Sequence, residues 1–217
     1  SNAVAPFASS NWVHIAGTYD ASNTDAGMTI YVDGVDQTNS RTSNGDWSAH
    51  QPDYTDVNFR IAAKSHGSTV VNWRKWNGLI DEVSIWSGSL SQANITSLAA
   101  GAKANAITAS ADIENNLLYY YKFDGNSNDT EGAANLTEVG GISYQTGLFA
   151  DCVALDGSSD YLTDASTISA ATKNDRSISL WFQYGGAQGY VCRLGYRGTI
   201  AIWVTAAGEI NPFYYDS

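Results

Sequence analysis

The sequence predicts an all-β protein, an antiparallel β-sandwich with one short helix. The first observation is a period of two in the alternation of apolar and polar residues, which is typical of strands that bury one face. The pattern is clearest in residues 11–20 and returns at 28–32, 57–63, 78–86, 117–124, 151–155, 177–184, 189–194 and 199–204. The second is the spacing of these runs by clusters of Gly, Asn, Asp and Ser, which form turns. Many short strands with no helices between them indicate a sandwich.

One segment of the chain carries a helical pattern instead. Ser91 is a suitable N-cap, because its hydroxyl can accept a hydrogen bond from a free backbone amide of the first turn. Ile95 and Leu98 supply an apolar face, and Gly101 stands where a helix commonly ends. We therefore expect a single short helix between two predicted strands.

The composition is that of a folded domain with a substantial core. Hydrophobic residues make up 43% of the 217 residues, and there are 7 Trp and 13 Tyr against 3 Pro, so disorder is not expected. The length fits one large sandwich or two small domains, since all-β domains often exceed two hundred residues.

The charge is strongly negative and limits the expected partners. The 22 acidic and 11 basic residues give a net charge of -11, which repels nucleic-acid backbones and anionic lipid surfaces. We therefore expect no nucleic-acid partner, and no apolar run is long enough to predict membrane insertion. The carboxylates would suit calcium, a hard cation that prefers oxygen ligands, or they serve solubility alone.

The two cysteines, Cys152 and Cys192, are too few for a disulfide scaffold and match no zinc-site spacing. The sequence leaves open whether they form one disulfide or remain buried thiols.

Six segments of the sequence resemble the laminin G-like members of the concanavalin A-like lectin superfamily. Three of them are similar to motifs from the C-terminal half of that family, at residues 12–20, 28–34 and 78–86. Three later segments are similar to motifs from the N-terminal half, at residues 120–126, 154–161 and 177–182. The resemblance implies a jelly-roll sandwich of the concanavalin A-like type.

The two sets of motifs stand in reversed order along the chain. Residues 4–101 hold the C-terminal-half motifs, residues 102–115 read as a linker, and residues 116–217 hold the N-terminal-half motifs. A half sandwich would expose an apolar sheet face, so the halves must complement each other. We expect a circularly permuted single sandwich in a monomer, with a domain-swapped dimer as the alternative.

Acidic residues supply the candidate metal ligands. A period of two places Asp81 on the core face of its strand, where a carboxylate needs a partner. The turn 124–129 is rich in side-chain oxygens, and the resemblance implies a structural calcium ion near it. On that basis the predicted ligands are Asp81, Asp124, Asn126 and Asp129. The alternative is an ordinary Asx turn together with a salt-bridged Asp81.

No catalytic pattern stands out, so we do not expect an enzyme. Glycan hydrolases on this fold need two carboxylates on one face of a strand. Asp81 and Glu82 are adjacent, and in a regular strand they would point to opposite faces. The three histidines lie on separate segments without a nucleophile motif beside them.

Aromatic residues in loops are the candidate ligand contacts, because a sugar ring can stack on an exposed aromatic side chain. The candidates lie in two loops and are Trp47, His50 and Tyr54 in the first and Trp73 and Trp76 in the second. Packing beneath a long loop would explain them equally well.

These observations predict a non-catalytic, carbohydrate-binding, lectin-like module of a larger extracellular or surface protein. Its partner would be a glycan or a cell-surface protein. The alternative is a structural or adhesion module in a tandem array, and a weaker one is a glycan hydrolase, since this superfamily contains all three.

Overall fold

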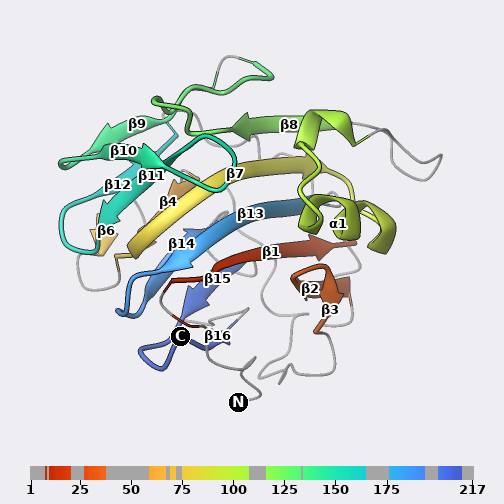
Figure 1. Ribbon diagram of the computed structural model, residues 1–217, viewed down its shortest axis with the longest axis horizontal. Helices are drawn as coiled ribbons and strands as arrows, with labels where there is room; N and C mark the ends of the chain where they lie inside the picture. Colours follow the sequence, from red (N-terminus) through yellow and green to blue (C-terminus); the bar gives the residue numbers. More distant parts are fainter. Residues whose placement is uncertain are drawn as a thin grey trace.

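The protein is a sandwich of two antiparallel β-sheets with one α-helix on its outer surface (Figure 1). The computed structural model describes residues 8, 10–20, 27–37, 59–66, 69–71, 75–107, 116–132, 134–164, 176–193 and 200–211. No helix within these residues is long and apolar enough to cross a membrane.

The first sheet forms the front layer in Figure 1. Its strand order is β10 (Ser143–Thr146), β11 (Asp151–Asp156), β7 (Asn77–Ser87), β13 (Arg176–Tyr184), β1 (Trp12–Tyr19), β2 (Met28–Val32) and β3 (Val35–Asp36). An eighth strand, β8 (Asn116–Tyr121), pairs with β7 beyond the end of β11. The long strand β7 is therefore central to this sheet.

The second sheet lies behind the first. Its order is β16 (Ile210–Asn211), β15 (Ala201–Val204), β14 (Gly189–Arg193), β4 (Arg60–Ile61), β12 (Tyr161–Thr163) and β9 (Thr137–Val139). A separate hairpin joins β5 (Lys64–His66) to β6 (Thr69–Val71).

Each sheet contains strands from both halves of the chain, and some strands of one half lie between strands of the other. In the first sheet β7 pairs with β8, β11 and β13, all of which come from residues 116–217. In the second sheet β4 lies between β12 and β14. Among the described residues, each sheet therefore contains strands from both halves of the chain.

The main core fills the space between the sheets. Its first-sheet members include Ile15, Ile85 and Leu180, and the second sheet contributes Ile61 and Ile202, all fully buried. This side-chain set follows the period of two that the sequence shows.

A smaller cluster lies on the outer face of the first sheet, under helix α1 (Gln92–Ala99). Ile95 and Leu98 pack there against Trp86 and Tyr31. The hydroxyl of Ser91 accepts a hydrogen bond from the amide of Asn94 at 3.3 Å. The helix ends as expected, at Ala100 followed by Gly101 with a φ of 93°. The predicted helix is thereby confirmed.

The segment predicted as a linker is ordered where the structure describes it. Residues Ala104–Ala106 form a 3₁₀ turn, and Ala104 is buried against the outer cluster. Cys152 and Cys192 are both free, buried thiols.

Candidate functional site

A β-bulge in strand β7 places Asp81 and Glu82 on the same face of the first sheet. Glu82 has a φ of 54°, and the pairing with β13 shifts by one residue at this point. Ile80 and Val83 both point into the core, so the two acids between them both point outward. This corrects two expectations. Asp81 does not share the core face, and the adjacent acids do not face opposite ways, because the extra residue interrupts the period of two.

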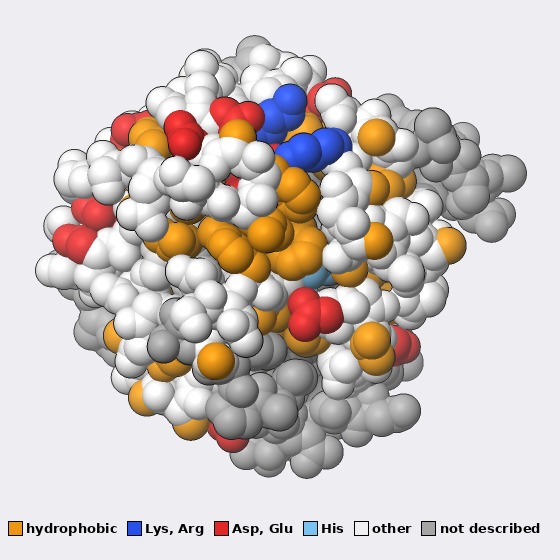
Figure 2. Space-filling view, viewed as in Figure 1, with side chains coloured by type: hydrophobic (Ala, Val, Ile, Leu, Met, Phe, Trp, Pro, Cys, Tyr) orange, Lys and Arg blue, Asp and Glu red, His pale blue; other side chains and the backbone are white. Residues whose placement is uncertain are grey.

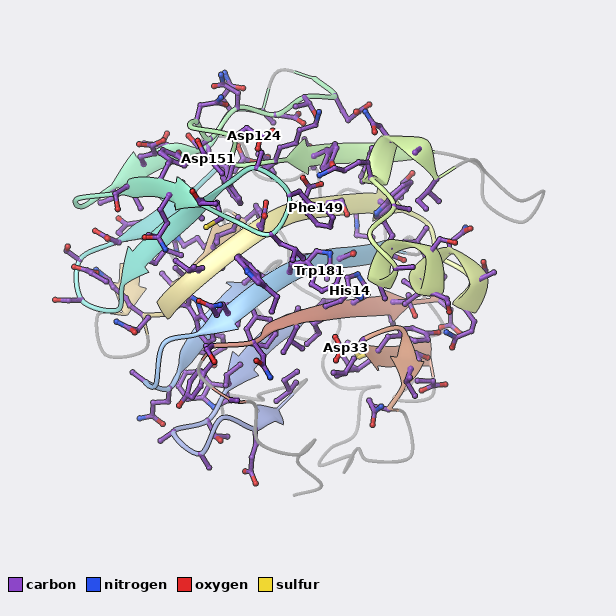
Figure 3. All side chains as sticks on the ribbon, in the orientation of Figure 1. His14, Asp33, Asp124, Phe149, Asp151 and Trp181 are labelled. Carbon is purple, nitrogen blue, oxygen red and sulfur yellow. The ribbon has the colours of Figure 1, made fainter. Side chains whose placement is uncertain are left out.

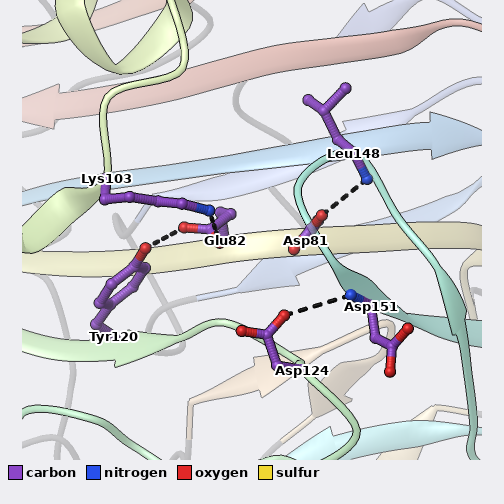
Figure 4. A network of polar contacts seen from close by, with 7 residues as sticks. All are labelled: Asp81, Glu82, Lys103, Tyr120, Asp124, Leu148 and Asp151. Carbon is purple, nitrogen blue, oxygen red and sulfur yellow. Dashed lines mark hydrogen bonds and ion pairs between the residues drawn. The ribbon is translucent and has the colours of Figure 1, made fainter.

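Glu82 is held by two neighbours on this outer face. One carboxylate oxygen accepts from the ammonium of Lys103 at 2.6 Å, and the other accepts a short hydrogen bond from the hydroxyl of Tyr120 (Figure 4). Burial, with a further contribution from Glu82, raises the pKa of Tyr120, which therefore stays a donor. Both oxygens of Glu82 are thus engaged.

Asp81 is fully buried and only partly hydrogen-bonded. Its Oδ2 accepts from the amide of Leu148 at 3.1 Å, whereas Oδ1 is buried without a protein partner. Burial first, and the charge of Glu82 second, raise the pKa of Asp81 to about 7. A buried carboxylate with one orphaned oxygen costs folding free energy unless a proton or a cation compensates it.

The polar side chains of the turn 124–129 mostly form hydrogen bonds with nearby backbone groups. Asn126 accepts from the amide of Asn128 and donates to the carbonyl of Asp124. Asp129 accepts from the amides of Tyr120 and Glu131 through a single oxygen. These contacts are those of an Asx turn and a side-chain bridge to β8.

The hairpin turn between β10 and β11 joins Asp81 to Asp124. Leu148 donates to Asp81, and the amide of Asp151 donates to Asp124 Oδ1 at 3.3 Å (Figure 4). Gly147 permits this close approach, since a Cβ there would lie 2.8 Å from Asp81 Oδ2. Two of the four predicted metal ligands therefore meet the same turn.

The four predicted calcium ligands do not converge on one point. Asn126 bonds within its own turn, whereas Asp129 accepts from the amides of Tyr120 and Glu131 through Oδ1 and its Oδ2 is buried without a protein partner. Within the described ranges, no three His, Cys, Asp or Glu side chains form a group that could hold a metal ion. The orphaned oxygen of Asp81 fits a cation, and Asp124 is the other member of the predicted set on the same hairpin turn. Calcium binding at the predicted set of Asp81, Asp124, Asn126 and Asp129 stays a prediction.

The predicted aromatic contacts divide into two groups. Trp47, His50, Tyr54 and Trp73 lie outside the described residues. Trp76 is fully buried, with its ring edge-to-face against Phe182 at a centroid distance of 5.4 Å. Trp76 therefore packs in the core and offers no surface platform, because its loop turns directly into β7.

A row of four residues crosses the part of the outer face that helix α1 leaves uncovered. Figure 3 shows Phe149 from the β10–β11 turn, Trp181 from β13, His14 from β1 and Asp33 after β2 in line across the strands. In Figure 2 the same place is hollow and lined by hydrophobic side chains, with a histidine at the bottom. We call this row the outer-face groove.

The aromatic rings of the outer-face groove support one another. Trp181 is half-buried. Its ring makes T-shaped contacts with the rings of His14 and Phe149, at centroid distances of 5.2 Å and 6.0 Å. Phe149 is 37% exposed and lies under the ammonium of Lys103, 3.8 Å from its ring centre. These contacts fix the Trp181 ring in place while part of its surface stays open.

His14 forms the floor of the outer-face groove. Its Nε2 lies 2.9 Å from the hydroxyl of Ser179, while Nδ1 is buried without a protein partner. Burial lowers the pKa of His14 to about 4, so the ring is neutral near pH 7. Its backbone amide donates to Asp33 Oδ1 at 2.9 Å, which ties His14 to the next member of the row.

The sequence contains a signal for the place of Trp181 in this row. Leu180 and Phe182 are core residues, so a period of two puts Trp181 on the outer face. The sequence does not show that helix α1 stops short of Trp181, because that depends on tertiary packing.

Comparison with known proteins supports the family resemblance over the first part of the chain. The family model described as the concanavalin A-like lectin/glucanases superfamily, Laminin_G_3, matches residues 1–96. Searches of curated proteins and of solved structures gave no match. The match covers the C-terminal-half motifs only, so the permuted order of the halves stays a prediction.

Proposed function

We propose that this chain is a non-catalytic, carbohydrate-binding module, because its residues 1–96 match the family model of the concanavalin A-like lectin/glucanases superfamily. The observation that carries the proposal is the uncovered row of Trp181, Phe149 and His14 on the outer sheet face. Sugar rings have apolar faces that stack on aromatic side chains and hydroxyls that need hydrogen-bonding groups beside them. The outer-face groove offers both kinds of contact.

The same face argues against a hydrolase, although Asp81 and Glu82 share it. Glycoside hydrolysis needs two carboxyl groups that both reach the substrate. Asp81 is fully buried beneath the β10–β11 turn, and Glu82 is 7% exposed with both oxygens bound by Lys103 and Tyr120. A glycosidic bond in the outer-face groove would meet neither group.

A calcium ion held by Asp81 and Asp124 belongs to the same proposal. Calcium would compensate the negative charge of Asp81 and would fix the β10–β11 turn, which carries Phe149, against β7. Its role would be structural, because it would hold an aromatic residue of the outer-face groove in place.

The location of the module in a larger protein is also part of the proposal, and it follows from the resemblance to the superfamily. We place the module in a larger extracellular or surface protein, where its net charge of -11 would keep it soluble. The alternative is an adhesion or spacer module that binds a protein. Trp47, His50, Tyr54 and Trp73 remain predicted contacts for either ligand.

A glycan array with the fluorescently labelled chain tests the proposal. We expect retention on at least one group of related glycans, and no release of reducing ends when the same glycans are incubated with the protein in solution. Absence of binding to every glycan would overturn the carbohydrate assignment and favour a protein partner. Release of reducing ends would overturn the non-catalytic assignment.

A further inference from the structure

We propose that the outer-face groove is the binding site and that its ligand is a neutral oligosaccharide longer than one sugar. This inference rests on the proposed carbohydrate-binding function and adds the site and the ligand class. It follows from three features of the groove, namely its polar floor, its length and its charge.

The floor of the groove favours a hydroxylated ligand over an apolar one. His14 is fully buried, and its Nδ1 lacks a protein partner. The ring lies at the bottom of the hollow between Trp181 and Asp33 (Figures 2 and 3). A buried polar atom without a partner keeps its full desolvation penalty, and an apolar side chain bound over it would not relieve that penalty. A sugar hydroxyl can bond to a neutral imidazole nitrogen in either tautomer.

The length of the groove favours several linked sugars. Asp33 follows β2, His14 lies on β1 and Trp181 lies on β13. Phe149 lies over β7, because its neighbour Leu148 donates a hydrogen bond to Asp81 of that strand. The row therefore spans three inter-strand spacings, about 14 Å. A single sugar would contact only part of this row.

The charges around the groove cancel. Lys103 is paired with Glu82, Lys122 lies 5.5 Å from the centre of the Tyr120 ring, and Asp33 stands exposed at the opposite end. These two cations and two anions leave no net positive charge to attract uronates or sulfates, and the chain as a whole carries -11. A neutral glycan meets no repulsion here, whereas uronates and sulfates would.

The test uses calorimetric titration of the full chain with neutral cello-, manno- and xylo-oligosaccharides from monosaccharide to hexasaccharide, and with oligogalacturonates. We expect affinity for one neutral series to rise with chain length, and the oligogalacturonates to bind more weakly. Trp181→Ala and Phe149→Ala should each weaken binding by about tenfold or more, as for other aromatic anchors. Val35→Ala is the matched control, since Val35 is 60% exposed on the edge strand β3.

The possible outcomes separate the two proposals. Unchanged affinity in folded Trp181→Ala and Phe149→Ala variants would overturn the outer-face groove as the site and leave the carbohydrate assignment intact. Preference for oligogalacturonates would overturn the neutral ligand class. If neither the array nor the titration detects a glycan, the carbohydrate assignment fails and this inference with it. If Trp181→Ala does not fold, Phe149→Ala and the ¹⁵N shifts of the His14 ring on titration decide the question.

Discussion

Asp81 and Glu82, adjacent in the chain, point to the same face of strand β7. The bulge that allows this brings a buried carboxylate with one orphaned oxygen beside a second acid that Lys103 and Tyr120 already hold. The free energy of this arrangement depends on what compensates the charge of Asp81, and that dependence can be measured.

Asp81→Asn should remove a pH-dependent loss of stability. The pKa of Asp81 is about 7 in the folded protein against an ordinary value of 3.8, so the folded state keeps a proton that the unfolded chain releases. Without a cation, the stability contributed by this group is complete below about pH 4 and is lost as the pH rises through 7, by on the order of 2–4 kcal/mol. Urea unfolding in chelator from pH 4 to 8 measures this loss. Asp81→Asn should lack it, whereas Glu131→Gln, at an exposed acid, should keep it. Equal pH slopes in wild type and Asp81→Asn would contradict the assignment.

Calcium should stabilise the wild-type protein through Asp81 and Asp124. An ion that binds only the folded state adds about 2.7 kcal/mol at a hundredfold excess over Kd. Thermal melting with calcium and with chelator checks this. We expect the difference to vanish in Asp81→Asn and Asp124→Asn and to persist in Asn126→Ala, because Asn126 bonds within its own turn. Equal melting midpoints of the wild type with and without calcium would refute the site.

His14→Gln should make the protein less sensitive to acid. The pKa of His14 is lowered from 6.5 to about 4, so the folded state resists a proton that the unfolded chain accepts. The stability contributed by the neutral ring is present above pH 6.5 and is lost as the pH falls through 4, by about 3 kcal/mol. Asp81 changes stability in the opposite direction over this window, so the difference between wild type and His14→Gln is the informative quantity. The hypothesis fails if that difference is constant from pH 7 to 4.

Neither half of the chain should fold alone. Strand β7 lies among β8, β11 and β13, and β1 pairs with β13, so residues 1–107 without the second half would leave both strands with open edges. We expect the fragments 1–107 and 108–217 to lack cooperative melting separately and to regain it when mixed. A cooperative, monomeric fragment 1–107 would contradict a shared sandwich.

The sequence predicts every described strand of five residues or more, because the period of two survives there, and it predicts helix α1 because Ser91 and Gly101 mark its ends. It misses several strands of two to four residues, which are too short to show an alternation; these are β3, β5, β6, β9, β10, β12 and β16. It predicts the face of Asp81 wrongly, since a bulge at Glu82 has no signal in residue type, and a non-glycine residue with positive φ is uncommon. The sequence predicts Trp76 in a surface loop, because the alternation begins only after it, but Trp76 already lies in the core between the sheets. The groove of Phe149, Trp181 and His14 depends on residues far apart in sequence, so only the fold brings it together.

The most direct test of the central claim is the glycan array with the wild-type chain, followed by calorimetric titration of the glycans that bind. The account predicts binding of at least one neutral oligosaccharide, with affinity that increases with its length and no cleavage of the ligand. A protein that binds no glycan on the array, while remaining folded by its melting curve, would contradict it.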